Sequence, residues 1–387
     1  MNKFLLVLLI AFTPTIALLL RGVLWGADSF AFLSVSCGNV GIEKLGHPFF
    51  AQFVPLFNCN FYLIITVMFI FYFLSLIALW VFGNYLFKNK GYLLPIVVGS
   101  IGVLFFFEAM RFENQLFGVT LSLIAIGLFT LYLLHNKSLT GLFALFLAII
   151  TALISILFWF PSIFILPLAF FVLKLPNWVE KIVLLIIIVA GIIFYGPYAL
   201  HSFTQLVLFP SENMIAEELP IIGIVFILHI IHFRKNIPKN LYWYSIILII
   251  IGLVKIKYMF IATIVLSIGL VVKELSQGLY IRQTKLPIVP LAIYFLILLL
   301  ISSQFVYPTQ NDVTEINELI QKSNETKIPI YNDWGQGWLF ESLGYETQYK
   351  ISRPNPDYET LTRPFYAYTT QKINNCTQTS KRTFECN

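Results

Sequence analysis

Long apolar runs alternate with short polar segments from the N-terminus to about residue 303. A helix needs about 20 mostly apolar residues to cross a bilayer. The runs that meet or approach this length predict about eleven spans, at 4–20, 61–83, 91–107, 116–134, 141–159, 162–173, 182–200, 220–233, 241–254, 258–272 and 286–303. The sixth run is short and follows Pro161, so a tilted, broken or re-entrant segment is an alternative there.

The first run also resembles the apolar part of a signal peptide. No clear small-residue cleavage site follows it, and many similar runs do. An uncleaved first helix is therefore favoured over a cleaved leader.

The chain becomes polar from about Ser303 onward. Apolar residues at helical or alternating spacing predict helices over 313–321 and 338–343 and strands over 328–331 and 345–351. We therefore divide the chain into a transmembrane domain of residues 1–303 and a small external α/β domain of residues 304–387. The predicted class is an all-α polytopic membrane protein with this small domain appended.

Lys and Arg residues in the connecting segments predict the orientation. With the N-terminus inside, twelve fall on the inner side: Lys3, Lys88, Lys90, Lys137, Lys174, Lys181, Arg234, Lys235, Lys239, Lys273, Arg282 and Lys285. Five fall in the outer loops: Arg21, Lys44, Arg111, Lys255 and Lys257. The sequence thus predicts an integral protein of the plasma membrane, with a cytoplasmic N-terminus and an extracytoplasmic C-terminal domain.

Composition agrees with this class. The chain is 58% hydrophobic and 11% charged, whereas soluble domains have roughly 25% charged residues. The net charge of +6 does not indicate nucleic-acid binding, because most basic residues sit in short loops where topology accounts for them.

The four cysteines fall in segments that we place outside. The pairs Cys37–Cys59 and Cys376–Cys386 suit an oxidising compartment, and free thiols are the alternative. The tail carries two N-glycosylation sequons, beginning at Asn324 and Asn375, which are weak further support for an external tail.

Seven acids lie in three of the outer loops, after the first, third and seventh spans: Asp28, Glu43, Glu108, Glu113, Glu212, Glu217 and Glu218. Each of them alone is explained as a solvated loop residue. Helices in a bundle would bring these loops together, and several carboxylates at one place repel unless a cation lies among them. Oxygen ligands favour Mg²⁺ or Mn²⁺.

Lys255 and Lys257 interrupt an apolar stretch at the outer face. A charge near hydrocarbon is costly, so it usually has a partner or a function. A lipid phosphate is a natural partner, and snorkelling to the interface is the alternative. The pattern predicts transfer of a group from a lipid-phosphate donor, with carboxylates as bases and a cation and lysine stabilising the leaving group.

Five short segments resemble the GT-C glycosyltransferases, in particular the catalytic subunit of oligosaccharyltransferase and its archaeal and bacterial relatives. Gly26-Ala-Asp28-Ser-Phe-Ala-Phe-Leu33 resembles the metal-binding first-loop motif, with Phe in place of the usual aromatic hydroxyls. Arg111-Phe-Glu113-Asn-Gln115 resembles the D-x-D loop. There Glu113 matches the first acid, and Gln115 replaces the second.

The other three segments follow in the family's order. Ile215-Ala-Glu217-Glu-Leu-Pro resembles the motif whose glutamate engages metal and acceptor, and Glu212 is a second register for it. Lys255-Ile-Lys257-Tyr-Met resembles the segment whose arginine holds the lipid diphosphate, although Lys lacks the bidentate geometry of Arg. Tyr331-Asn-Asp333-Trp334-Gly resembles the acceptor-reading motif, without its two leading tryptophans.

The resemblance implies an inverting, metal-dependent glycosyltransferase that uses a polyprenyl-phosphate-type donor and a protein, lipid or glycan acceptor outside the cytoplasm. It assigns metal binding to Asp28, Glu113 and Glu217, acceptor activation to Asp28 and Glu217, donor phosphate to Lys257 and Lys255, and the acceptor to Asp333 and Trp334. Packing of the small domain is the alternative role for Trp334.

Two other classes of function stay open. A transporter or flippase for lipid-linked sugars predicts polar residues inside the spans, and the spans are almost wholly apolar. An inactive relative that serves as an assembly subunit predicts the losses at Gln115 and before Asp333.

Overall fold

The computed structural model describes residues 3–24, 27–42, 48–101, 109–135, 138–168, 308–333, 336–345 and 356–386, and five isolated residues, Leu185, Val189, Trp243, Tyr244 and Ile246. The chain forms two compact units. The helical unit comprises Met1–Pro14, Met68–Ala109 and Asn114–Phe295, and the mixed unit comprises Thr15–Val67, Met110–Glu113 and Leu296–Asn387.

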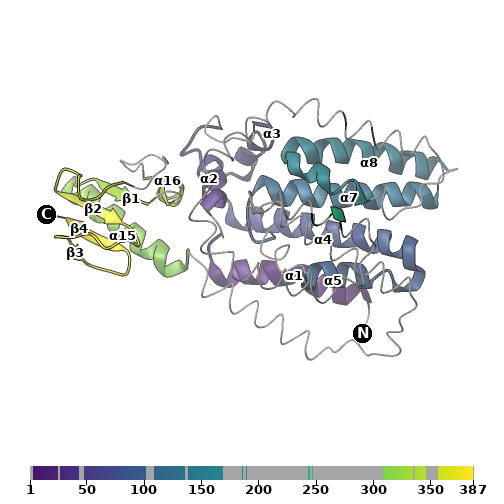
Figure 1. The fold of residues 1–387 in the computed structure, drawn as a ribbon, viewed down its shortest axis with the longest axis horizontal. Coiled ribbons are helices and arrows are strands. Elements are labelled where there is room, and N and C mark those ends of the chain that lie inside the picture. Colours follow the sequence, from purple (N-terminus) through teal and green to yellow (C-terminus); the bar gives the residue numbers. More distant parts are fainter. Residues whose placement is uncertain are drawn as a thin grey trace. The chain divides into compact units, whose positions relative to one another are not determined.

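Within the described ranges, four helices are long and apolar enough to cross a membrane (Figure 1). They are α1 (Lys3–Arg21), α4 (Phe61–Phe87), α7 (Asn114–Leu134) and α8 (Leu139–Phe158). All four match predicted spans. The third predicted span begins as α5 (Leu93–Ile101). The later spans lie outside the described residues, so the total of about eleven stays a prediction.

Residues 162–167 of the sixth predicted span form 3₁₀ helix and turns. A 3₁₀ helix, η4 (Phe160–Phe164), follows α8 directly, with Pro161 in its first turn. Proline is tolerated at the start of a helix because its missing N–H has no partner there in any case. Residues 160–167 fit the alternative of a broken segment after Pro161, and the sixth span beyond residue 168 lies outside the described residues.

Small and polar residues bring α7 and α8 together. A Cβ added at Gly118 of α7 would lie 2.6 Å from the Cβ of Trp159. Ser122 Oγ of α7 lies 3.0 Å from Ser155 Oγ of α8. Without water to drive apolar association, membrane helices pack through small residues and interhelical hydrogen bonds of this kind.

The C-terminal part of the mixed unit, residues 308–386, contains a four-stranded sheet in the order β1-β2-β4-β3 (Figure 1). Its strands are β1 (Ile330–Asn332), β2 (Phe365–Tyr368), β3 (Thr377–Gln378) and β4 (Thr383–Cys386). Strand β1 is parallel to β2, and the other pairs are antiparallel. The predicted small sheet is confirmed, with its first strand shifted by one or two residues.

Two helices accompany the sheet, α15 (Gln310–Thr326) and α16 (Gly337–Ser342). Both were predicted, and α15 is longer at each end than the apolar spacing indicated. Its start is fixed by a capping box, in which Thr309 accepts from the Asp312 N–H and Asp312 accepts from the Thr309 N–H. The strand predicted over 345–351 lies almost wholly outside the described residues.

Strand β2 is central and buried on both faces, because side chains alternate along a strand. Tyr366 and Tyr368 point into a core with Ile316, Leu319 and Phe340. Phe365 and Ala367 point into a second core, whose other members are Tyr358, Ile373, Phe384 and Cys386. Every residue of β2 is buried, so the strand reads as a short apolar run and not as an alternation.

Three further helices lie in the first-loop part of the mixed unit: α2 (Ala27–Ser36), α3 (Pro48–Ala51) and the 3₁₀ helix η2 (Val54–Phe57). The pattern of long apolar runs gave no prediction of them. The disulfide Cys37–Cys59 closes this loop, and Cys376–Cys386 joins the C-terminal strand to the residue before β3. Both predicted pairs are confirmed.

Candidate functional site

The segment with the first predicted metal ligand is helix α2, where Asp28 is the second residue. The helix belongs to the same core as the C-terminal sheet, because Phe30 packs with Ile316, Phe340 and Tyr366. Its C-terminal end is held to α16 by Ser34 Oγ, which donates to the Trp338 carbonyl at 3.2 Å. Asn39 Nδ2 donates to the Glu341 carbonyl at 2.8 Å just beyond it. First loop and C-terminal region therefore form one packed structure.

The segment with the second predicted ligand is Met110–Glu113, also in the mixed unit. Glu113 and Arg111 are both buried, and Arg111 Nε lies 2.9 Å from Glu113 Oε1. Between them, Phe112 lies edge-on to Phe57 at 5.0 Å and to Phe32 of α2 at 6.2 Å between ring centroids. The aromatic contacts thus bring the Arg111–Glu113 ion pair against the first loop.

Gln115, at the position of the second acid of the D-x-D pattern, is buried in the first turn of α7. Beside it, Asn114 Nδ2 donates to the Phe158 carbonyl at 3.0 Å. This bond satisfies one carbonyl at the C-terminal end of α8, where the helix itself leaves carbonyls without partners. Asn114 therefore has a structural role that its sequence context did not indicate.

The acid of the predicted acceptor-reading segment, Asp333, directly follows β1 and is buried. Its carboxylate accepts hydrogen bonds from Tyr358 Oη at 2.9 Å and from the Thr370 N–H at 3.2 Å. Thr369 Oγ1 lies 2.8 Å from both carboxylate oxygens. Asp333 thus joins β1 to the segment that follows β2. Neither Tyr358 nor Thr369 was singled out from the sequence, and their distance along the chain offered no local signal.

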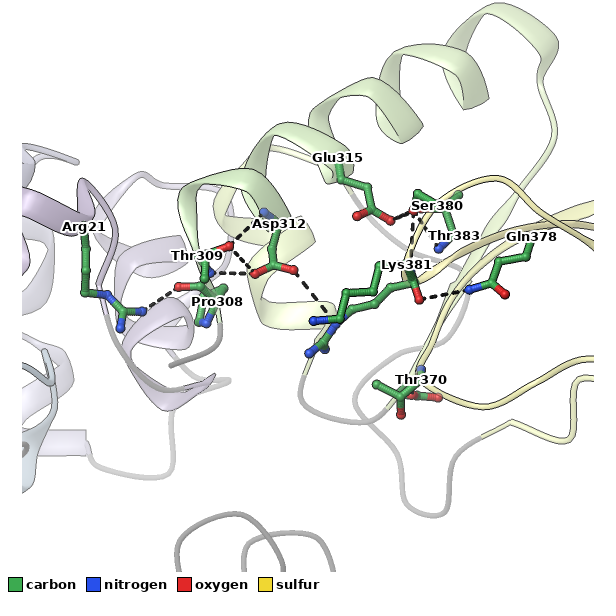
Figure 2. A network of polar contacts seen from close by, with 12 residues as sticks. Arg21, Pro308, Thr309, Asp312, Glu315, Thr370, Gln378, Ser380, Lys381 and Thr383 are labelled. Atoms are coloured by element: carbon green, nitrogen blue, oxygen red, sulfur yellow. Dashed lines mark hydrogen bonds and ion pairs between the residues drawn. The ribbon is translucent and has the colours of Figure 1, made fainter. Parts of the chain in front are cut away.

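A polar network links the end of α1 to the C-terminal region (Figure 2). Arg21, the last residue of α1, donates to the Pro308 carbonyl at 2.5 Å. The next residues form the capping box of α15, and Arg382 Nε lies 3.9 Å from Asp312. One turn later, Glu315 accepts from Ser380 and from Thr383 Oγ1. The network holds α15 to the hairpin of β3 and β4 on one side and to the end of α1 on the other.

Several predicted site residues lie outside the described residues, namely Glu212, Glu217, Lys255, Lys257 and Trp334. The backbone of Asp28 is described and its side chain is not. Within the described ranges there is no group of three or more His, Cys, Asp or Glu residues that could hold a metal ion. The predicted roles of Asp28, Glu113, Glu217, Lys255, Lys257, Asp333 and Trp334 stay predictions.

No family model matches the chain, and no curated protein matches it. A crystal structure of the Archaeoglobus fulgidus oligosaccharyltransferase, in complex with zinc and sulfate, is similar with a TM-score of 0.48 at 14% identity, over 88% of this chain and 62% of that one. The archaeal oligosaccharyltransferase AglB from A. fulgidus, in complex with an inhibitory peptide and a dolichol-phosphate, is similar with a TM-score of 0.42 at 13% identity, over 89% of this chain and 64% of that one. The chain thus spans less than two thirds of the length of both structures, and likeness at these scores does not by itself identify a fold or an activity.

Proposed function

We propose that the protein is an inverting, metal-dependent membrane glycosyltransferase. It transfers a sugar or oligosaccharide from a polyprenyl-phosphate or polyprenyl-diphosphate lipid to an acceptor on the extracytoplasmic side. One observation supports this above the others. Phe32, one helical turn after Asp28, packs against Phe112, the neighbour of Glu113. Two acid-bearing segments that are far apart in the sequence therefore meet in one unit.

Convergence of acids is what the proposal requires, since a shared cation needs ligands from several segments. Asp28, Glu113 and Glu217 would hold it, and three carboxylates fit a hard cation such as Mg²⁺ or Mn²⁺. The Arg111 guanidinium lies 2.9 Å from the Glu113 carboxylate, and a carboxylate must be deprotonated to ligate a metal. When bound, the cation supplies charge neutralisation at the phosphate leaving group.

The chain's own residues account for the remaining chemistry. Asp28 and Glu217 orient the acceptor nucleophile and accept hydrogen bonds from it. Lys257 and Lys255 bind the donor phosphate and stabilise the negative charge that grows on it as the glycosidic bond breaks. Asp333 and Trp334 belong to the acceptor side, where Asp333 holds the strand end in place through Tyr358 and Thr369.

Replacement of the acids tests the proposal. In native membranes supplied with lipid-linked sugar, Asp28→Asn and Glu217→Gln should each lower transfer about 10²–10⁴-fold, the usual range for loss of a general base. Glu318→Gln, an exposed acid on α15, is the matched control and should leave transfer unchanged. Undiminished transfer by Glu217→Gln would show that this residue is not catalytic.

The acceptor and the rival functions are separated in the same membranes. A sequon peptide that is glycosylated indicates an oligosaccharyltransferase, whereas a glycosylated lipid or glycan indicates transfer of a single sugar. Movement of the lipid-linked sugar across the bilayer without transfer would favour a flippase. No transfer and no movement by the wild-type chain, with folding verified by its unfolding transition, would favour an assembly subunit.

A further inference from the structure

Residues 48–57, which lie between the two cysteines of the Cys37–Cys59 disulfide, are apolar except for Gln52, which is exposed. Residues 48–57, Pro-Phe-Phe-Ala-Gln-Phe-Val-Pro-Leu-Phe, contain no charged residue. One set of side chains is buried in the mixed unit: Phe50, Ala51, Val54 and Phe57. Phe50 lies edge-on to Phe32 at 5.1 Å between centroids, and Phe57 lies edge-on to Phe112. These contacts fix the segment to the candidate site.

The second set of side chains is exposed in the described part of the chain. Phe49 is 40% exposed, Phe53 41% and Leu56 73%. Exposed apolar side chains resume a few residues later at the start of α4, with Tyr62 and Leu63. Because α4 is long and apolar enough to cross a membrane, the segment is continuous with a surface that suits lipid.

The C-terminal region of the same unit provides a comparison for the exposure of large hydrophobic side chains. Across the described residues of the C-terminal region, 308–386, no large hydrophobic side chain is exposed. Its apolar residues are instead collected in the two cores on either side of the sheet. An exposed aromatic and aliphatic surface is thus found in the segment next to α4 and not in this region, as expected where two parts of one unit meet different solvents.

The backbone of the segment also suits an environment poor in water. Four backbone N–H groups along it each donate to the carbonyl three residues earlier. The donors are Phe53, Leu56, Asn58 and Asn60. At its end the Cys59 N–H donates to Ser36 Oγ at 2.9 Å. Local satisfaction of backbone groups is what a segment at the hydrocarbon boundary needs.

We infer that residues 48–57 form an interfacial anchor, with Phe49, Phe53 and Leu56 inserted among the acyl chains and headgroups of the adjacent bilayer leaflet. Apolar faces of this type lie about 5–10 Å into the boundary region, and Phe and Leu are typical residues of such faces. The anchor packs through Phe57 and Phe32 on the segments that bear Glu113 and Asp28. It therefore sets the height of these segments above the lipid surface.

Site-directed spin labelling tests the anchor in the full chain. All four natural cysteines are in disulfides, so one introduced cysteine is labelled selectively. Leu56→Cys is compared with Leu74→Cys on the apolar surface of α4 and with Glu318→Cys on the exposed face of α15. The three variants are placed in nanodiscs of phosphatidylcholine and phosphatidylglycerol. Collision with lipid-soluble oxygen and with a water-soluble nickel chelate is then measured by power saturation.

The label at Leu56 should collide severalfold more with oxygen relative to nickel than the label at Glu318, and so approach the ratio at Leu74. A ratio equal to that at Glu318 would overturn the anchor. A label at Leu56 shielded from both reagents would also overturn it, because protein would then cover the segment. An oxygen preference that appears only after addition of a polyprenyl phosphate would overturn it too, since the surface would then belong to that lipid and not to the bilayer.

A Phe53→Asp variant provides a second readout. It keeps the buried contacts of Phe50 and Phe57. It should lower the ratio of oxygen to nickel collisions for the label at Leu56 and leave the ratio at Leu74 unchanged. If the label at Leu56 did not move, Phe53 would not share its environment, and the anchor as drawn would be wrong. The wild type and Phe53→Asp should be incorporated into the nanodiscs to the same extent, because the transmembrane helices hold both proteins in the bilayer.

Discussion

Helices α8 and α15 have similar lengths, 20 and 17 residues, and place their apolar side chains differently. Helix α8 buries its small residues, Gly141, Ala144, Ala148 and Ala152, and exposes Phe143 and Phe146. Helix α15 buries Ile316 and Leu319 and exposes polar residues. Large residues outward and small residues inward suit lipid, and the reverse suits water. The sizes of the buried and exposed side chains, as well as their polarity, therefore indicate whether a helix faces lipid or water.

The largest expected contrast comes from deletion of one aromatic ring in each region. Phe340 is fully buried beside Tyr368. The Phe340→Ala substitution should lower the free energy of unfolding by about 3–5 kcal/mol, as for other buried phenylalanines. Phe143→Ala on the exposed face of α8 should cost no more than about 0.5 kcal/mol. Denaturant titration of both variants measures the difference. Equal losses would mean that the exposed face of α8 is packed and not lipid-facing.

A charge placed on the lipid-facing side should come next. Phe146→Asp in α8 should cost about 2.5–3.5 kcal/mol, the range for Asp near the centre of a membrane helix. Thr314→Asp on the exposed face of α15 should change stability by about 0.5 kcal/mol or less. Membrane-insertion yield and unfolding of the inserted fraction provide the two measurements. Normal insertion of Phe146→Asp would place that side chain in a polar environment.

The buried carboxylate of Asp333 offers a third test, confined to the water-facing region. Asp333→Ala leaves the buried hydroxyl donors of Tyr358 and Thr369 without this acceptor, which costs about 1–3 kcal/mol. Asp333→Asn retains one acceptor oxygen and should lose less. An Ala variant as stable as wild type would show that solvent replaces the carboxylate there.

The smallest effect is expected at an exposed ion pair. The hydrogen bond to Glu385 raises the pKa of Lys322 above its ordinary value of 10.5. A raised lysine pKa contributes stability below the unfolded value and loses it as pH rises through the folded value. Lys322→Met should therefore cost about 0.2–1 kcal/mol at pH 8, discounted for exposure, and nothing above the folded pKa. Denaturant midpoints followed from pH 8 upward through the lysine titration would show whether the difference shrinks.

Apolar length and periodicity predicted the parts of the fold that depend on local sequence. The four described spans, α15 and α16 are of this kind, whereas both cysteine pairs were predicted from the placement of the cysteines in outer segments. Helix α2 was missed because it is short, and Phe30 is buried by residues from the other end of the chain. Strand β2 was missed because its four buried residues have no alternation, and β4 because its partner is β2.

The candidate site divides in the same way. Residue types and motif order indicated Asp28 and Glu113. The contact that brings their segments together is made by Phe32 and Phe112, which are two of the 38 phenylalanines in the chain. Nothing local distinguishes it. The hydroxyls that bind Asp333 are likewise ordinary Tyr and Thr residues, 25 and 36 positions away.

Phe30 is near the start of the chain, and the core that covers it is supplied almost entirely by residues from 313 onward. During synthesis this ring stays uncovered until most of the polypeptide has left the ribosome. A chain that is terminated early, or cleaved before α16, would expose the hydrophobic surface around Phe30. Proteases and chaperones act on incompletely folded chains, so the packing of residues 313–368 on Phe30 protects the first loop from them.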